Sequence, residues 1–93
     1  MSRIPDTITE ATLWTNAWSS EEVGRHIAQL RKAKGLRQAE FAELLGVSRT
    51  TLSALENGRS VSFKLAVKAV SYLGSRFVIV PKSAHITVGA RDR

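Results

Sequence analysis

Apolar residues recur at helical spacing through the middle of this 93-residue chain. Between residues 20 and 35 they lie three or four positions apart, which predicts a helix that begins after Ser19 and ends at Gly35. The same spacing predicts helices over residues 38–45 and 49–57, and a fourth helix that ends at Gly74. The apolar positions expected to face a shared core are Val23, Ile27, Leu30, Phe41, Leu44, Leu45, Leu52, Leu55, Phe63, Val67, Val70 and Leu73.

Serine residues stand where three of these helices should begin. Ser19 is followed three positions later by Glu22, a spacing that fits a capping box. Ser48 can accept a hydrogen bond from the first free N–H groups of the third helix, and either Ser60 or Ser62 can do the same for the fourth. The helix boundaries are therefore supported by local chemistry as well as by the apolar pattern.

Residues 76–81 differ in kind, because they are β-branched and aromatic without polar alternation. This pattern predicts a short strand, and a strand needs a partner. Two pairings are open: the same strand of a second subunit across a twofold axis, which is favoured, or a hairpin in which residues 85–88 return. The predicted fold is all-α, with four or five helices and a short C-terminal strand that pairs across a dimer. The side chains expected to hold the dimer are Phe77, Val78, Ile79 and Val80.

The net charge of +6 is unevenly distributed. Residues 24–82 contain eleven Lys or Arg against three Glu, whereas the first 23 residues carry a net charge of −3. A basic middle indicates contact with a polyanion such as nucleic acid, since phosphate neutralisation supplies much of non-specific binding. The alternative is a solvated basic surface. The absence of cysteine suits a reducing cytoplasm, and no run of residues has the length and apolarity of a signal peptide or membrane span. We therefore expect a cytoplasmic protein without a membrane partner.

Residues 35–59 predict two short helices joined by a tight turn, the arrangement that places a helix in the DNA major groove. Gly46 suits the left-handed conformation that ends the first of these helices. The second has few apolar positions and offers polar side chains, as a helix that faces base edges would need. The side chains expected to contact bases are Arg49, Thr50, Thr51 and Ser53.

The same segment resembles the helix-turn-helix of phage-repressor-like regulators of the Cro and Xre type. In that family a Gln opens the second helix, an Ala follows four residues on, and Gly-Val-Ser makes the turn; here these are Gln38, Ala42 and residues 46–48. The closing Leu-Glu-Asn-Gly, residues 55–58, is also typical. The resemblance implies a lambda-repressor-like fold and sequence-specific DNA binding. Arg37 departs from the family, which more often has a capping Thr or Ser there, so we expect a weaker cap.

The end of the helical region is similar to HipB-type antitoxins, through Leu73, Gly74 and the Val-Pro-Lys of residues 80–82. That resemblance implies a homodimer that represses its own operon at an inverted-repeat operator in double-stranded DNA. It also implies a HipA-like serine/threonine kinase toxin as partner. The alternative is a stand-alone or phage-type repressor with no toxin, because such regulators share the first four helices.

The aligned motif and the geometry of the helix divide the candidate site residues into base readers and phosphate contacts. Arg49 is the principal base reader, because a guanidinium can bind guanine O6 and N7 together; a phosphate contact is its alternative. Thr50 is a stronger candidate for a base contact than Thr51. Glu56 is expected to form an internal ion pair or helix brace. The residues expected to contact phosphate are Gln38, Arg37, Asn57, Arg59 and Lys64. For Lys34 and Arg37, a phosphate contact and a side chain that faces only solvent are equal alternatives.

No residue pattern in the chain indicates an enzyme, a metal site or a cofactor. His26 and His85 are the only histidines, and neither has a spaced ligand or nucleophile partner. The domain organisation we expect is an extension over residues 1–19 with a possible short helix, a helix-turn-helix domain over 20–75, a dimerisation strand over 76–81, and a flexible tail or returning strand over 82–93. Trp14 and Trp18 of the extension would pack on the domain or its dimer mate, or else anchor a protein partner.

Overall fold

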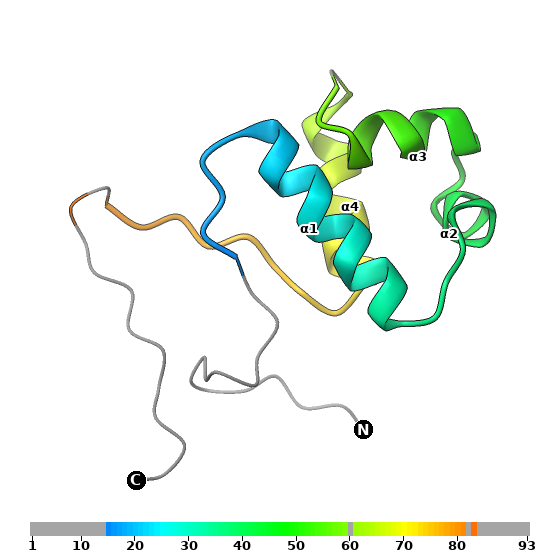
Figure 1. Ribbon diagram of the computed structural model, residues 1–93, viewed down its shortest axis with the longest axis horizontal. Coiled ribbons are helices and arrows are strands. Elements are labelled where there is room, and N and C mark those ends of the chain that lie inside the picture. Colours follow the sequence, from blue (N-terminus) through cyan, green and yellow to red (C-terminus); the bar gives the residue numbers. More distant parts are fainter. Residues whose placement is uncertain (1–14, 60, 82, 84–93) are drawn as a thin grey trace, which may run out of the picture. The chain divides into compact units, whose positions relative to one another are not determined.

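The computed structural model describes residues 15–59, 61–81 and 83. Its helices lie in one compact unit, Asn16–Val78. The all-α fold class is confirmed, and helices begin where the apolar pattern and the capping residues place them (Figure 1). In chain order the helices are α1 (Ser20–Ala33), α2 (Gln38–Leu45), α3 (Arg49–Glu56) and α4 (Phe63–Tyr72).

Serine side chains cap three of the four helices. The hydroxyl oxygens of Ser19, Ser48 and Ser62 each accept a hydrogen bond from the backbone N–H three residues further on, at 3.0 to 3.2 Å. Ser62 is thus the cap of α4, where the sequence left two candidates. Between α2 and α3, Gly46 has a φ of 76°, the left-handed conformation that ends a helix at low steric cost. The predicted turn is confirmed.

The hydrophobic core draws on all four helices, with Ile27, Phe41 and Leu52 almost fully buried at its centre. Three predicted core positions are wrong: Leu44, Phe63 and Val67 are exposed. In α4 the buried stripe is rotated from the predicted one: Leu65 and two alanines are buried in place of Phe63 and Val67. The buried residues of this stripe are Leu65, Ala66, Ala69, Val70 and Leu73.

Gly24 marks the closest approach of two helices. A Cβ atom at this position would lie 2.4 Å from the backbone oxygen of Leu55 and 2.6 Å from that of Glu56. Because even alanine would overlap these oxygens, α1 can pack against α3 at this distance only through a glycine. This contact holds the C-terminal end of α3 against α1.

Residues 76–81 form no strand, and no strand occurs among the residues that the structure describes. A strand pairing between subunits needs a second chain, so that pairing stays a prediction. Phe77 packs its ring against Phe63 at a centroid distance of 5.9 Å. Trp18 is exposed and lies outside any helix. Residues 15–18 of the extension are not helical, so the possible short helix does not reach them. The predictions for Trp14, for the rest of that helix and for the returning strand at residues 85–88 concern positions outside the described residues.

Candidate nucleic-acid interface

A buried ion pair connects α1 to the end of α3. The Arg31 guanidinium donates from Nε to Glu56 Oε2 at 2.7 Å and from Nη2 to Glu56 Oε1 at 3.0 Å. Its Nη1 donates to the backbone oxygen of Leu36 at 2.8 Å, in the segment that leads into α2. Both charged side chains are less than one tenth exposed. The prediction that Glu56 forms an internal ion pair is confirmed.

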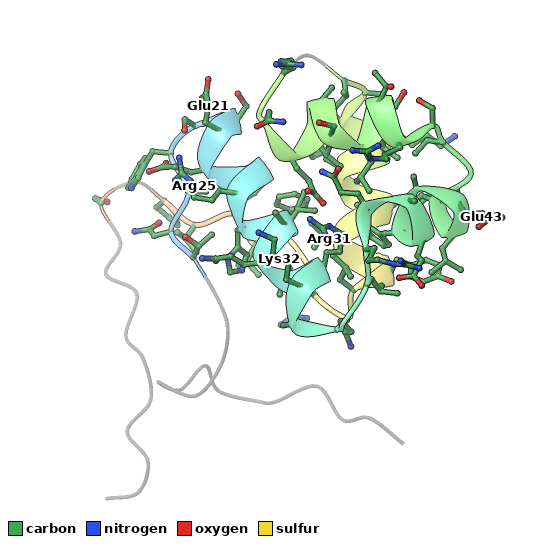
Figure 2. All side chains as sticks on the ribbon, turned by 45° about the vertical axis from the view of Figure 1, so that its right-hand side comes forward. Glu21, Arg25, Arg31, Lys32 and Glu43 are labelled. Atoms are coloured by element: carbon green, nitrogen blue, oxygen red, sulfur yellow. The ribbon has the colours of Figure 1, made fainter. Side chains whose placement is uncertain are left out.

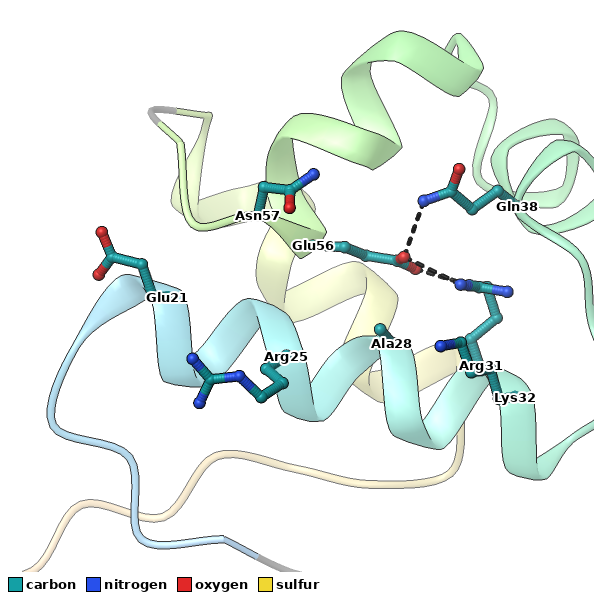
Figure 3. A pocket seen from close by; sticks show the side chains of 8 residues that line it. All are labelled: Glu21, Arg25, Ala28, Arg31, Lys32, Gln38, Glu56 and Asn57. Atoms are coloured by element: carbon teal, nitrogen blue, oxygen red, sulfur yellow. Dashed lines mark hydrogen bonds and ion pairs between the residues drawn. The ribbon is translucent and has the colours of Figure 1, made fainter.

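Gln38 completes this cluster from the first position of α2. Its Nε2 donates to Glu56 Oε1 at 2.9 Å (Figure 3). A carboxylate only accepts hydrogen bonds, so the amide nitrogen must face Glu56, and its second N–H is left for another acceptor. We call the Arg31, Gln38 and Glu56 side chains the buried brace. The brace ties α1, α2 and α3 together and so fixes the direction in which α3 points.

The N-terminal half of α3 presents polar side chains to solvent. Arg49 and Thr50 are exposed, whereas Thr51 and Ser53 are half-buried. The Thr51 hydroxyl also accepts a hydrogen bond from Ser48 Oγ at 3.0 Å. Of the four predicted base readers, Arg49 and Thr50 are therefore the most accessible to a DNA groove.

The predicted phosphate contacts lie at both ends of the helix-turn-helix. Gln38 is half-buried at the start of α2, and Asn57 is exposed at the end of α3. Asn57 Nδ2 donates to the backbone oxygen of Ser53 at 2.8 Å, which holds the amide beside the helix. Arg59 and Lys64 are exposed in the segment that follows α3 and in the first turn of α4. These four side chains come from three segments: α2, the end of α3 with the residues that follow it, and α4.

Arg37 occupies the cap position of α2, and its side chain has no acceptor atom with which to cap the helix. Instead, the Glu40 carboxylate accepts from Arg37 N at 2.9 Å and from Arg37 Nη2 at 3.4 Å. These bonds, the backbone one first, together with the charge of Arg37, hold the pKa of Glu40 below its ordinary value of 4.5. The expected departure from a side-chain cap is confirmed.

Sequence reasoning missed three residues that position the site. Arg31 was not identified as the partner of Glu56, and Gly24 was not recognised as a contact between helices. Lys68 of α4 donates from Nζ to the backbone oxygen of Leu45 at 3.0 Å, where a positive charge favours the C-terminal end of α2. Of these three residues, only Gly24 gave a signal in the sequence. A glycine inside a helix lowers its stability, so its presence there indicates a close packing contact.

Two general features of the described residues bear on the site. No three His, Cys, Asp or Glu side chains gather there in a way that could hold a metal ion. No helix among them is both long and apolar enough to cross a membrane.

Comparison with known proteins agrees with this geometry. The helix-turn-helix family model matches residues 27–79, more than half of the chain. The chain is 37% identical over 76 residues to the ImmF control region 10 kDa protein of Bacillus phage phi105, covering 78% of this chain and 84% of the phage protein. It is 50% identical over 38 residues to the antitoxin PezA of Streptococcus pneumoniae serotype 4, covering 41% of this chain and only 24% of PezA.

A solved structure of a HipB variant in complex with an O2 20mer has a similar fold. The TM-score is 0.67 at 20% identity, and the match covers 75% of this chain and 99% of that chain. The matched family region contains the buried brace, α3 and all of α4. The chain therefore belongs to the helix-turn-helix family of DNA-binding regulators.

Proposed function

We propose that this protein is a cytoplasmic transcriptional repressor that binds an inverted-repeat operator as a homodimer. The observation that carries the proposal is the buried brace, which fixes α3 while Arg49 and Thr50 at its N-terminal half stay exposed. A helix held in this way can enter the major groove without first being ordered. Association then costs less conformational entropy.

In this proposal α3 reads bases and its flanks hold the DNA backbone. Arg49 binds guanine through O6 and N7, a contact that discriminates against other bases by about 1–3 kcal/mol. Thr50, Thr51 and Ser53 supply further contacts. The second N–H of Gln38 Nε2 is directed to a phosphate, which is an acceptor. The remaining phosphate contacts come from Arg37, Asn57, Arg59 and Lys64.

The homodimer would form through residues 77–80. Phe77, Val78, Ile79 and Val80 are all exposed in the single chain, a run of apolar side chains that water does not favour. Strand pairing across a twofold axis would cover them and satisfy their backbone groups. It would also place two copies of α3 in successive major grooves, about 34 Å apart.

We further propose that the repressor is an antitoxin that neutralises a HipA-like serine/threonine kinase toxin. Its likeness to HipB-type antitoxins at residues 73–74 and 80–82, and the antitoxin name of PezA, support this role. The alternative is a phage-type repressor without a toxin. The match to the phage phi105 protein, which spans most of both chains, favours that alternative.

Footprinting on operator DNA tests the repressor proposal. The duplex is first recovered by selection from a random library with the wild-type protein. Arg49→Ala should then relax the base preference at one position in each half-site, whereas Gln38→Ala should weaken binding to all sequences alike. Arg49→Lys is the charge control, because it keeps the positive charge and removes the bidentate fork of the guanidinium. Equal losses of specificity for Arg49→Ala and Gln38→Ala would contradict the assigned roles.

Co-expression with the adjacent reading frame tests the antitoxin proposal. If the neighbouring gene encodes a kinase-like protein, the two products should co-purify, and this chain should relieve the growth arrest that the kinase alone causes. A chain with no kinase-like neighbour, or one that neither binds nor neutralises it, supports the phage-type alternative.

A further inference from the structure

We infer that α1 provides a second set of DNA phosphate contacts through Arg25 and Lys32, in a groove between α1 and the C-terminal end of α3. This inference rests on the proposed DNA-binding function. It adds an element outside the two helices of the motif to the DNA-contacting surface.

The groove is an open depression of about 450 Å³. Gln38 and Asn57, two proposed phosphate contacts from different helices, both border it (Figure 3). Its other wall is α1, from which Arg25, Ala28 and Lys32 line the groove. A DNA backbone held by Gln38 and Asn57 would therefore run beside these α1 side chains.

The spacing of the α1 residues places them on one face. Arg25 and Lys32 are seven positions apart, close to two full turns, so their side chains project from the same side of the helix about 10 Å apart along its axis. Both are labelled along α1 in Figure 2. Ala28, between them, is small and leaves the space between the two cations open.

The charges in the groove leave these two cations available. Arg31 also borders the groove, but its guanidinium is committed to Glu56 and Leu36. The buried carboxylate of Glu56 is in turn compensated by Arg31. Among the residues that the structure describes, Arg25 and Lys32 are exposed and take part in no ion pair. Glu21 is the remaining acid of the groove and lies at its far end, toward the start of α1 (Figure 3).

Lys34 supplies a matched control on the same helix end. It is two positions from Lys32, about 200° around the helix axis. A Cβ atom on Gly74 would lie 3.7 Å from Lys34 Nζ, which places this ammonium beside the end of α4. Lys34 is absent from the lining of the groove. Lys32 lies in the last turn of α1 and Lys34 is the residue that follows the helix, so Lys32→Gln and Lys34→Gln remove the same charge two positions apart, one inside and one outside the groove.

The experiment measures the affinity of the full chain for the selected operator duplex and for a mixed-sequence duplex at several salt concentrations. Arg25→Gln and Lys32→Gln should each reduce the slope of log K against log salt by about 0.9 per subunit, because each variant neutralises one phosphate fewer. The reduction should be equal on both duplexes, because phosphate contacts carry no sequence information. Lys34→Gln should leave the slope unchanged. Thermal unfolding should be unchanged in all three variants, because the side chains are exposed.

Equal slopes for Lys32→Gln and Lys34→Gln would overturn the inference, since the effect would then follow from net charge alone. An unchanged slope in both Arg25→Gln and Lys32→Gln would overturn it as well. Both results leave the proposed function standing if the wild type binds the operator. A wild-type protein that binds neither duplex would instead overturn the proposed function together with this inference.

Discussion

Removing one partner of the buried brace should cost the protein a large part of its stability. Arg31→Met deletes the guanidinium that donates two hydrogen bonds to Glu56 and one to Leu36. The Glu56 carboxylate then stays buried with Gln38 as its one side-chain donor. Breaking a buried pair in this way costs about 3–5 kcal/mol. A domain of this size has a total stability on the order of 3–9 kcal/mol, so the loss is a large fraction of it and the urea midpoint of the variant should fall steeply.

A double-mutant cycle separates the ion pair from general disruption of the core. Arg31→Met combined with Glu56→Leu removes both charges and leaves apolar side chains in their place. The pair of substitutions should cost less than either single one, because no uncompensated charge is left buried. Gln38→Ala removes one hydrogen bond to a charged group and should cost about 1.5–3 kcal/mol.

Urea unfolding followed by far-UV circular dichroism measures the wild type and these variants at 25 °C. If Arg31→Met keeps the wild-type stability within about 0.5 kcal/mol, the assignment of the brace is refuted, because removing one partner of a buried ion pair costs several kcal/mol. Simple addition of the two single costs in the double variant would show that the charges do not interact.

Three further changes test separate features of the fold. Gly24→Ala should destabilise the unit by about 1–3 kcal/mol in urea unfolding, because the new methyl group overlaps backbone oxygens of α3; unchanged stability would contradict the close approach. Ser48→Ala should cost about 1 kcal/mol in the same assay, because it removes the acceptor for Thr51 N, and a neutral result would exclude that cap. Glu40 has a lowered pKa, caused first by the bond from the Arg37 backbone, so its charge stabilises the fold above pH 4.5. The stability advantage of the wild type over Glu40→Gln should therefore shrink as the pH falls below 4.5, and a gap independent of pH would rule this out.

Local chemistry explains why helix starts could be predicted from the sequence. Ser19 and Ser48 cap their helices through bonds that span three residues, so the pattern that forms the cap lies entirely within a short segment. The same holds for Gly46, whose conformation depends on its own missing side chain. The helix-turn-helix formed by α2 and α3, and the polar surface of α3, could be predicted from such short-range signals.

Features set by tertiary packing could not be predicted in the same way. Phe63 and Val67 fit a helical stripe as well as the buried residues of α4 do, and contact with the other helices decides between the two faces. Arg31 looks like one more cation on a polar helix face. Its burial depends on Glu56, 25 positions later in the chain, which no local pattern connects to it. The groove beside Arg25 exists for the same reason, because it forms where α1 meets α3.

Selection of DNA from a random duplex library is the most direct test of sequence-specific binding by a dimer. The wild-type protein should enrich an inverted repeat whose half-sites are centred about one helical turn apart, with a guanine in each half-site that Arg49→Ala no longer requires. Enrichment of no motif, or of a single site without a dyad that Arg49→Ala binds equally well, would contradict the account.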